Sequence, residues 1–280
     1  MSKTFLRSAS PVLSLSTAAA LLSLVPAALP CHARPAAQPP PPAAAAPVAP
    51  TDPLLKPSPK TDPATAAHGF WGANNPSAWK DFHTNFVAEA KKGKAKVVFL
   101  GDSITRGWDG AGKAEWEKRF APLGAVNFGI GGDRTQQVLW RIENGTLDGL
   151  DPKLIVLKIG VNNLWADVNE YGRDKVAAGI AQVVTALRAK APKAKILVLG
   201  ILPAMEKPDH PMRAHAAAIN ELTAKLDNGK NVRYRDVGAV FVRPDGTISK
   251  EIMPDFVHLS PEGYRLFADA IEPTMKEMLR

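Results

Sequence analysis

Ser103 follows a run of apolar residues that predicts a strand ending in a turn. In the stretch KVVFLGDSITRGW, the apolar residues Val97–Leu100 lead directly into Gly101 and Asp102. Such a run, ended by small and polar residues, is typical of a buried parallel strand that enters a turn. The serine is therefore either an ordinary turn residue, whose side chain bonds nearby backbone groups, or the nucleophile of an acyl-transfer reaction.

A serine nucleophile needs a general base, a group that orients the base, and donors for the oxyanion. His258 lies three residues after Asp255 and just before Ser260 and Pro261, which predict the N-cap and first residue of a helix. A carboxylate at this separation can reach the imidazole and fix its tautomer, which leaves the other ring nitrogen free for Ser103. On this pair alone, a capping aspartate beside an unrelated surface histidine remains an open alternative.

Other chemistries find less support in the sequence. His210 and His215 are five residues apart, off one helical face, and no third ligand is evident, so we expect no metal site. A dinucleotide fingerprint in this chain would need glycine where Arg134 stands, and no phosphate-binding G-x-x-x-x-G-K-[ST] loop occurs. We therefore expect a site that uses no cofactor.

The elements that must position these residues alternate between strands and helices from residue 77 onward. Apolar segments predict strands at Val97–Leu100, Val126–Phe128, Leu154–Ile159, Ile196–Leu199 and Val232–Tyr234. Helical spacing predicts helices that end near Gly93 or span 113–120, 134–143, 171–190, 212–227 and Pro261–Leu279. This alternation predicts a three-layer α/β/α sandwich with a central parallel sheet of about five strands. Ligands bind such sheets beyond the carboxyl ends of the strands, where Ser103 is expected.

Four segments carry a resemblance to a known family. In this order, GDSITRGW, NFGIGGDRTQQVLWRIENG, IGVNN and DFVHLSPEGY resemble the sequence blocks of the SGNH (GDSL-type) hydrolases. The second and fourth segments are especially similar to the catalytic subunits of intracellular platelet-activating-factor acetylhydrolase. The similarity extends from about Trp79 to the C-terminus, and it implies the flavodoxin-like fold and the serine esterase activity of that family.

The resemblance also implies a role for each matching residue. Ser103 matches the nucleophile, His258 the base and Asp255 the acid that orients the base. The backbone N–H groups of Ser103 and Gly132 and the side chain of Asn162 match the oxyanion donors. A glycine lets its N–H approach the reacting oxygen without a Cβ, and an asparagine amide is a neutral donor. There is no G-x-S-x-G motif in the chain, so the sharp elbow of the α/β-hydrolases is not expected.

The substrate is less defined by the sequence. The resemblance implies short acyl groups, acetyl above all, and the predicted export described below argues against a phospholipid. Trp108 and Trp165 belong to no apolar helical stripe, so they are predicted to line the site and stack on an acetylated sugar, with core packing as the alternative. An acyltransferase with the same site and a non-catalytic, glycan-binding envelope module are the alternative functions. The resemblance also leaves a homodimer open.

The N-terminal segment predicts export. Lys3 and Arg7 precede an apolar stretch, and small residues that include Ala33 end it, so we predict a signal peptide over 1–33 and a periplasmic or secreted protein. A membrane anchor is less favoured because prolines interrupt the stretch. A lipoprotein anchored through Cys31 is less favoured because Pro30 precedes that cysteine.

Two further segments complete the predicted organisation. Residues 34–66 are rich in proline and alanine, which predicts an extended linker, and residues 67–280 form the hydrolase domain. Cys31 is the only cysteine, so the processed chain holds no disulfide, thiolate metal site or cysteine nucleophile. The formal net charge is +8, but the one dense basic run, 91–96, is expected to solvate a helix end. The predicted partner is a small-molecule or glycan ester, with no nucleic acid and no stable membrane span.

Overall fold

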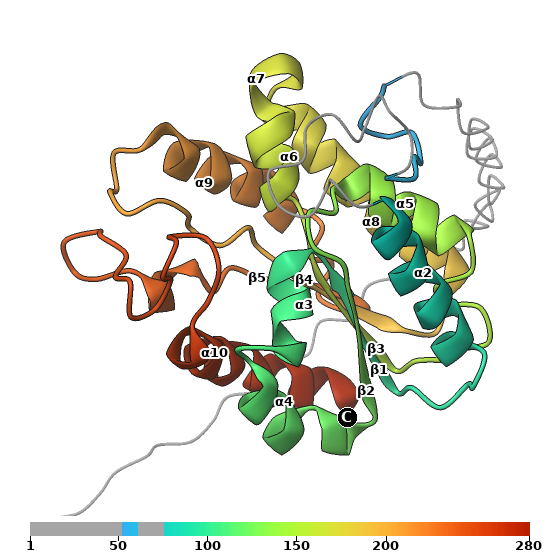
Figure 1. The fold of residues 1–280 in the computed structure, drawn as a ribbon. Helices are drawn as coiled ribbons and strands as arrows, with labels where there is room; N and C mark the ends of the chain where they lie inside the picture. The colour runs from blue at the N-terminus through green and yellow to red at the C-terminus, as the bar shows by residue number, and fades with distance from the viewer. Residues whose placement is uncertain (1–51, 61–75) are drawn as a thin grey trace, which may run out of the picture. The chain divides into compact units, whose positions relative to one another are not determined.

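A parallel sheet of five strands forms the centre of the structure (Figure 1). The computed structural model describes residues 52–60 and 76–280, and the predicted signal peptide over 1–33 lies outside them. The strands are β1 (Val97–Gly101), β2 (Ala125–Gly129), β3 (Leu154–Lys158), β4 (Lys195–Leu199) and β5 (Val232–Arg235). Their order is β2-β1-β3-β4-β5 and every neighbouring pair is parallel. The predicted α/β/α fold with about five parallel strands is confirmed.

The residue types explain both the sheet and its register. All residues of β1 and β3 are buried, as expected for strands that are covered on both faces and are apolar almost throughout. Gly101 at the end of β1 is level with Gly129 of β2 and with Lys158 of β3. The three segments that leave these strands therefore begin at the same edge of the sheet.

Helices cover the two faces of this sheet. The α-helices of the described residues are α2 (Pro76–Ala90), α3 (Ser103–Arg106), α4 (Lys113–Arg119), α5 (Thr135–Glu143), α6 (Val161–Ala166), α7 (Val168–Tyr171), α8 (Arg173–Lys190), α9 (Pro211–Ala224) and α10 (Pro261–Leu279). Helices α5, α8 and α9 pack side by side on one face with α2 beside α5, whereas α4 and α10 pack together on the other (Figure 1). Short 3₁₀ turns lie at η1 (Gly107–Asp109), η2 (Ala121–Leu123) and η3 (Gly238–Phe241). No helix in the described part of the chain is long and apolar enough to cross a membrane.

Two helical predictions differ in detail from the structure. The helix predicted over 171–190 begins two residues later, at Arg173, because Gly172 has a φ of 83° and separates α8 from α7. The short helices α3 and α6 begin two residues after the end of β1 and three after the end of β3, and they were not predicted. Both carry residues of the predicted site, so the strand ends lead into helical turns there.

Trp108 lies in the hydrophobic core, and the prediction that it lines the site is wrong. Its side chain is 1% exposed. The ring stacks on Phe267 at a centroid distance of 5.5 Å, meets Tyr264 at 4.6 Å and meets Phe120 edge-on at 5.2 Å. An aromatic ring enclosed on these sides has no face left for a sugar.

Residues 52–60, which we call the N-terminal strap, pack on the domain although they fall within the predicted linker over 34–66. Leu54 is 1% exposed and belongs to the core. The backbone N–H of Ser58 donates to the carbonyl of Gln136 on α5, at 3.2 Å. Asp52 pairs with Lys175 on α8, with 2.7 Å between Oδ2 and Nζ. This part of the chain thus belongs with the domain and not with a free spacer.

Candidate active site

The turn after β1 presents Ser103 at the edge of the sheet. Ser103 is the first residue of α3, and the side chain of Asp102 caps that helix by accepting a hydrogen bond of 3.0 Å from the N–H of Ile104. A Cβ at Gly101 would lie 2.0 Å from the carbonyl oxygen of Lys158, so only glycine fits there. Likewise a Cβ at Gly129 would lie 2.2 Å from a backbone nitrogen of α3, which lets the helix pack directly on β2.

The structure brings together the three residues predicted as nucleophile, base and orienting acid. Nε2 of His258 lies 2.9 Å from Oγ of Ser103, and Nδ1 lies 2.7 Å from Oδ2 of Asp255. The other carboxylate oxygen of Asp255 accepts hydrogen bonds from the N–H groups of Val257, at 3.0 Å, and His258, at 2.7 Å. Because the carboxylate holds Nδ1 as a donor, Nε2 is left to accept the proton of the serine hydroxyl.

The environment of Asp255 keeps its carboxylate charged. Partial burial acts to raise its pKa, but hydrogen bonds from the His258 backbone, the His258 imidazole and the Val257 backbone outweigh it, so the pKa is lowered from its ordinary value. The side chains of Asp255 and His258 are 38% and 29% exposed, so this edge of the site is open to solvent.

The loop that carries Asp255 and His258 is held by a second loop. Phe256 and Met205 both have positive φ angles, 61° and 72°, which side chains other than glycine seldom adopt. The N–H of Met205 donates to the carbonyl of Phe256 at 2.9 Å, and the guanidinium of Arg213 donates to the carbonyl of Met205 at 3.2 Å. Backbone strain of this kind persists only where neighbouring contacts impose it. Nothing in the sequence pattern predicted this support.

The two other predicted oxyanion donors are Gly132, on the loop that follows β2, and Asn162, on helix α6. A Cβ at Gly131 would lie 3.9 Å from the Cβ of Ser103, so this loop runs next to the serine. Gly132 has a φ of 73°, and its N–H has no acceptor among the described residues. Asn162, in the first turn of α6, donates to the carbonyl of Asp133 at 2.8 Å and so contacts the same loop.

Asn163, the neighbour of Asn162, stabilises the fold through buried hydrogen bonds. It is fully buried, its Oδ1 accepts the N–H of Thr135 at 3.0 Å, and its Nδ2 donates to Asp167 at 2.8 Å. Asp167 also pairs with Arg134 at 2.8 Å. The two adjacent asparagines thus face different surroundings, and Asn162 is the one that contacts the loop of Gly132.

A buried guanidinium beneath this edge was not predicted as part of the site. Arg141 of α5 is fully buried and donates to the carbonyls of Phe128, at 2.8 Å, and Gly101, at 3.1 Å. It also lies 2.9 Å from Oδ2 of Asp133, which is itself fully buried. One side chain therefore connects the ends of β1 and β2 to the loop that contains Gly132.

Burial dominates the ionisation of the groups around Arg141. Burial raises the pKa of Asp133, against the opposing charges of Arg141 and Lys60. Burial also lowers the pKa of Lys158, against the Asp102 carboxylate that lies 3.4 Å from its Nζ. Each buried charge has a neighbour of opposite sign, as isolated buried charges are too costly to be retained.

Trp165 is the remaining aromatic prediction. It lies on α6, three residues after Asn162, so the two side chains share a helical face. It is partly exposed and packs in part against the core. A role in substrate binding therefore stays a prediction for Trp165.

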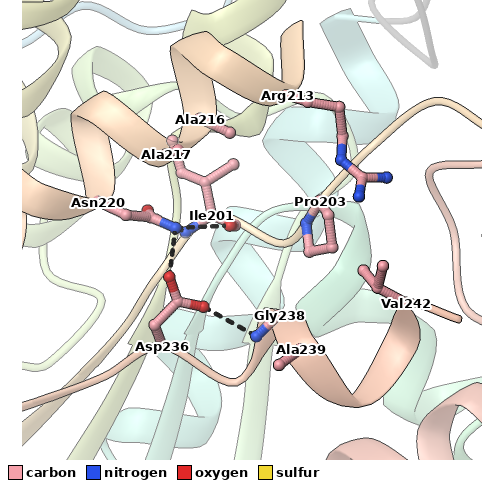
Figure 2. A pocket seen from close by; sticks show the side chains of 10 residues that line it. All are labelled: Ile201, Pro203, Arg213, Ala216, Ala217, Asn220, Asp236, Gly238, Ala239 and Val242. Atoms are coloured by element: carbon pink, nitrogen blue, oxygen red, sulfur yellow. Dashed lines mark hydrogen bonds between the residues drawn. The ribbon is translucent and has the colours of Figure 1, made fainter. Parts of the chain in front are cut away.

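A cavity of about 200 Å³ lies beyond the ends of β4 and β5, between α9 and η3 (Figure 2). Arg213 borders it on one side, and on the other Asp236 accepts hydrogen bonds from Asn220 and from the N–H of Gly238, at 3.0 and 2.8 Å. None of the predicted site residues lines this cavity. It is thus separate from the serine, although Arg213 connects it to the loop of His258.

Comparison with known proteins identifies the family. A model of the GDSL-like lipase/acylhydrolase family matches residues 99–266. The chain belongs to this family. Its human relatives include the alpha2 subunit of platelet-activating factor acetylhydrolase IB, 37% identical over 221 residues that cover 78% of this chain and 93% of the relative. The human alpha1 subunit is 38% identical over 203 residues, 72% of this chain and 84% of the relative.

Solved structures of other proteins share the fold. A GDSL-like lipase from Bacteroides thetaiotaomicron superposes with a TM-score of 0.56 at 24% identity and covers 71% of this chain and 97% of the other. An acetylxylan esterase from Geobacillus stearothermophilus gives a TM-score of 0.52 at 20% identity and covers 66% and 94%. Together with the relatives, the family membership makes this chain a carboxylic ester hydrolase.

The prediction of an exported, periplasmic or secreted protein is wrong by this comparison. The relatives that align with 78% of the chain are subunits of platelet-activating factor acetylhydrolase IB. These are the intracellular subunits that the sequence resembles. Residues 1–33, on which that prediction and the alternative of a Cys31 anchor depended, lie outside the described residues. Export therefore gives no reason to exclude a phospholipid substrate.

Removal of the Arg141 guanidinium should destabilise the protein strongly. In Arg141→Met the Asp133 carboxylate stays buried without its ion-pair partner, so we expect a loss of about 3–5 kcal/mol in the free energy of unfolding, measured with urea. The double variant with Asp133→Asn should recover part of this loss. Arg265→Met, which removes two exposed ion pairs, with Glu262 and Asp269, should cost less than about 1 kcal/mol. If Arg141→Met lowers the free energy of unfolding as little as Arg265→Met does, Arg141 does not stabilise the fold as described.

Proposed function

We propose that this ester hydrolase acts through a Ser103–His258–Asp255 triad on short-chain esters, acetyl esters above all. The observation that carries the proposal is the chain of two hydrogen-bonding distances, 2.9 Å from Ser103 Oγ to His258 Nε2 and 2.7 Å from His258 Nδ1 to Asp255. A serine hydroxyl becomes a nucleophile when a base within this reach takes its proton and a third group orients that base.

The proposed reaction has two stages. Oγ of Ser103 bonds to the ester carbonyl carbon while its proton moves to His258 Nε2. The tetrahedral intermediate then breaks its bond to the alcohol oxygen, which takes that proton from Nε2 and departs. Water attacks the acyl-enzyme, gives a proton to Nε2, and the acid leaves as the proton returns to Ser103 Oγ. The charged Asp255 stabilises the imidazolium in both stages.

The proposed oxyanion donors are the N–H groups of Ser103 and Gly132 and the side-chain amide of Asn162. Support comes from the Gly131–Gly132 loop, which runs beside Ser103, and from Asn162, which contacts that loop. Donors that are already in position when charge develops need no reorganisation, and each contributes about 3–4 kcal/mol in such sites.

Two classes of acetyl ester are candidates for the substrate. The relatives at 37% identity are named for platelet-activating factor, which favours an acetylated phospholipid. The partly exposed Trp165, on the same helical face as Asn162, favours an acetylated carbohydrate, because an aromatic face can stack on a sugar ring. The ratio of kcat/KM for an acetylated xylooligosaccharide and for a 2-acetyl glycerophospholipid separates the two.

Two alternative functions, an acyltransferase and a glycan-binding module, are compatible with parts of the same site. An acyltransferase would use the same acyl-enzyme and pass it to an acceptor hydroxyl instead of water, and product analysis with an added alcohol tests this. A non-catalytic glycan-binding module is disfavoured by membership of a family of acylhydrolases.

Hydrolysis of p-nitrophenyl esters from C2 to C12 tests the nucleophile and the acyl preference together. We expect activity to be highest on C2 and to fall with chain length. Ser103→Ala should lower kcat about 1,000-fold or more, since the covalent route is lost. Circular dichroism confirms that the variant is folded. Full activity in Ser103→Ala would contradict the mechanism, and a preference for long chains would contradict the substrate proposal.

A substitution of Trp165 tests the carbohydrate proposal. Trp165→Ala should raise KM for an acetylated xylooligosaccharide about 5- to 10-fold, which corresponds to the loss of about 1 kcal/mol of ring stacking. KM for p-nitrophenyl acetate should stay the same, and Trp165→Phe should restore most of the loss. Equal changes for both substrates would show that Trp165 supports the fold and does not bind the sugar.

A further inference from the structure

Lys60 reaches the candidate site from outside the part of the chain that matches the family model, which begins at residue 99. The lysine ends the N-terminal strap (residues 52–60), and its side chain is 4% exposed. Its Nζ donates a hydrogen bond of 2.6 Å to the carbonyl oxygen of Gly131. A buried ammonium is costly, so its placement against a backbone carbonyl requires a physical explanation.

The carbonyl that Lys60 holds belongs to the same peptide unit as the N–H of Gly132. A peptide unit is planar and trans, so its C=O and its N–H point in opposite directions. A donor that fixes the Gly131 oxygen therefore also fixes the direction of the Gly132 N–H. The hydrogen bond also polarises the amide and makes its N–H a stronger donor on the opposite side.

This peptide unit would otherwise turn easily. It joins two glycines, which have no Cβ to restrict rotation, and Gly132 already has a φ of 73°. A turned peptide unit would present a carbonyl oxygen where the proposed oxyanion needs an N–H. The Gly132 N–H has no acceptor of its own among the described residues, so no contact there holds it in the present direction.

The surroundings keep Lys60 in place from two sides. Its Nζ lies 4.0 Å from Oδ1 of Asp133, the residue that follows Gly132, and the same oxygen accepts a hydrogen bond of 2.7 Å from the indole N–H of Trp79. Leu54 anchors the strap in the core, and Ser58 binds the backbone of α5. The ammonium thus completes a charge cluster whose other cation, Arg141, faces the other carboxylate oxygen of Asp133.

We propose that Lys60 is a positioning residue that locks the Gly131–Gly132 peptide unit and thereby directs the Gly132 N–H into the oxyanion hole. The inference rests on the proposed function of Ser103 and Gly132. It makes the N-terminal strap a part of the active site, which the family blocks alone do not include.

The test measures kcat and KM for p-nitrophenyl acetate with the full chain and its Lys60→Met variant. A loosened oxyanion donor affects the transition state and not substrate binding, so we expect kcat to fall about 10- to 100-fold with KM changed less than twofold. Lys60→Arg, which keeps a charged donor, should recover part of kcat. If Lys60→Met does not fold, as judged by its thermal unfolding, Lys60→Gln is measured against the same criteria.

Two controls make the outcome decisive. Lys190→Met removes an exposed lysine that pairs with Asp148, and neither residue belongs to the strap or to the proposed site, so kcat should stay unchanged. A wild-type kcat in folded Lys60→Met, or an equal loss in Lys190→Met, overturns the proposal. Ser103→Ala is measured beside them: activity that persists there contradicts the proposed function itself, whereas activity lost there but kept in Lys60→Met contradicts only the role of Lys60.

Discussion

The buried guanidinium of Arg141 holds together the backbone segments on which the site depends. It binds the carbonyl of Gly101 at the end of β1, the carbonyl of Phe128 in β2, and the carboxylate of Asp133. Ser103 follows the first of these segments by two residues, and Gly132 directly precedes Asp133. Because the pairing register puts the ends of β1, β2 and β3 at one level, small displacements of the sheet edge would move the serine and the loop of Gly132 relative to each other.

The other half of the site comes from the C-terminal end of the chain, 155 residues away from Ser103. His258 reaches the serine from a loop just before α10, where Ser260 accepts the N–H of Gly263 at 3.1 Å and caps the helix. The strained backbone at Phe256, held through Met205, bends the chain between Asp255 and His258 so that carboxylate and imidazole meet. The His258 side chain is 29% exposed, whereas Asp102 and Ile104 on either side of the serine are buried, which suits the proposed role of His258 in exchanging protons with water and substrate.

The sequence predicted the parts of this structure that leave a local signal. Apolar runs located the five strands, and Ser260 with Pro261 located the start of α10, because burial and capping depend on residues close in sequence. The carbonyl contacts of Arg141 and Lys60 span 40 and 71 residues and leave no periodic pattern. Trp108 was assigned to the site for the same reason, since the rings that enclose it come from distant segments such as α10. Residues that are adjacent in sequence, such as Asn162 and Asn163, could be told apart only through the resemblance to a family.

The most direct test of the account is covalent labelling with a fluorophosphonate, followed by intact-mass measurement and peptide mapping. An activated serine attacks the phosphorus and displaces fluoride, which leaves a stable adduct on its oxygen. We expect one adduct per chain, located on Ser103, and no adduct on His258→Ala under the same conditions. An adduct on another serine, or a folded wild-type chain that stays unlabelled, would contradict the claim that Ser103 is the activated nucleophile.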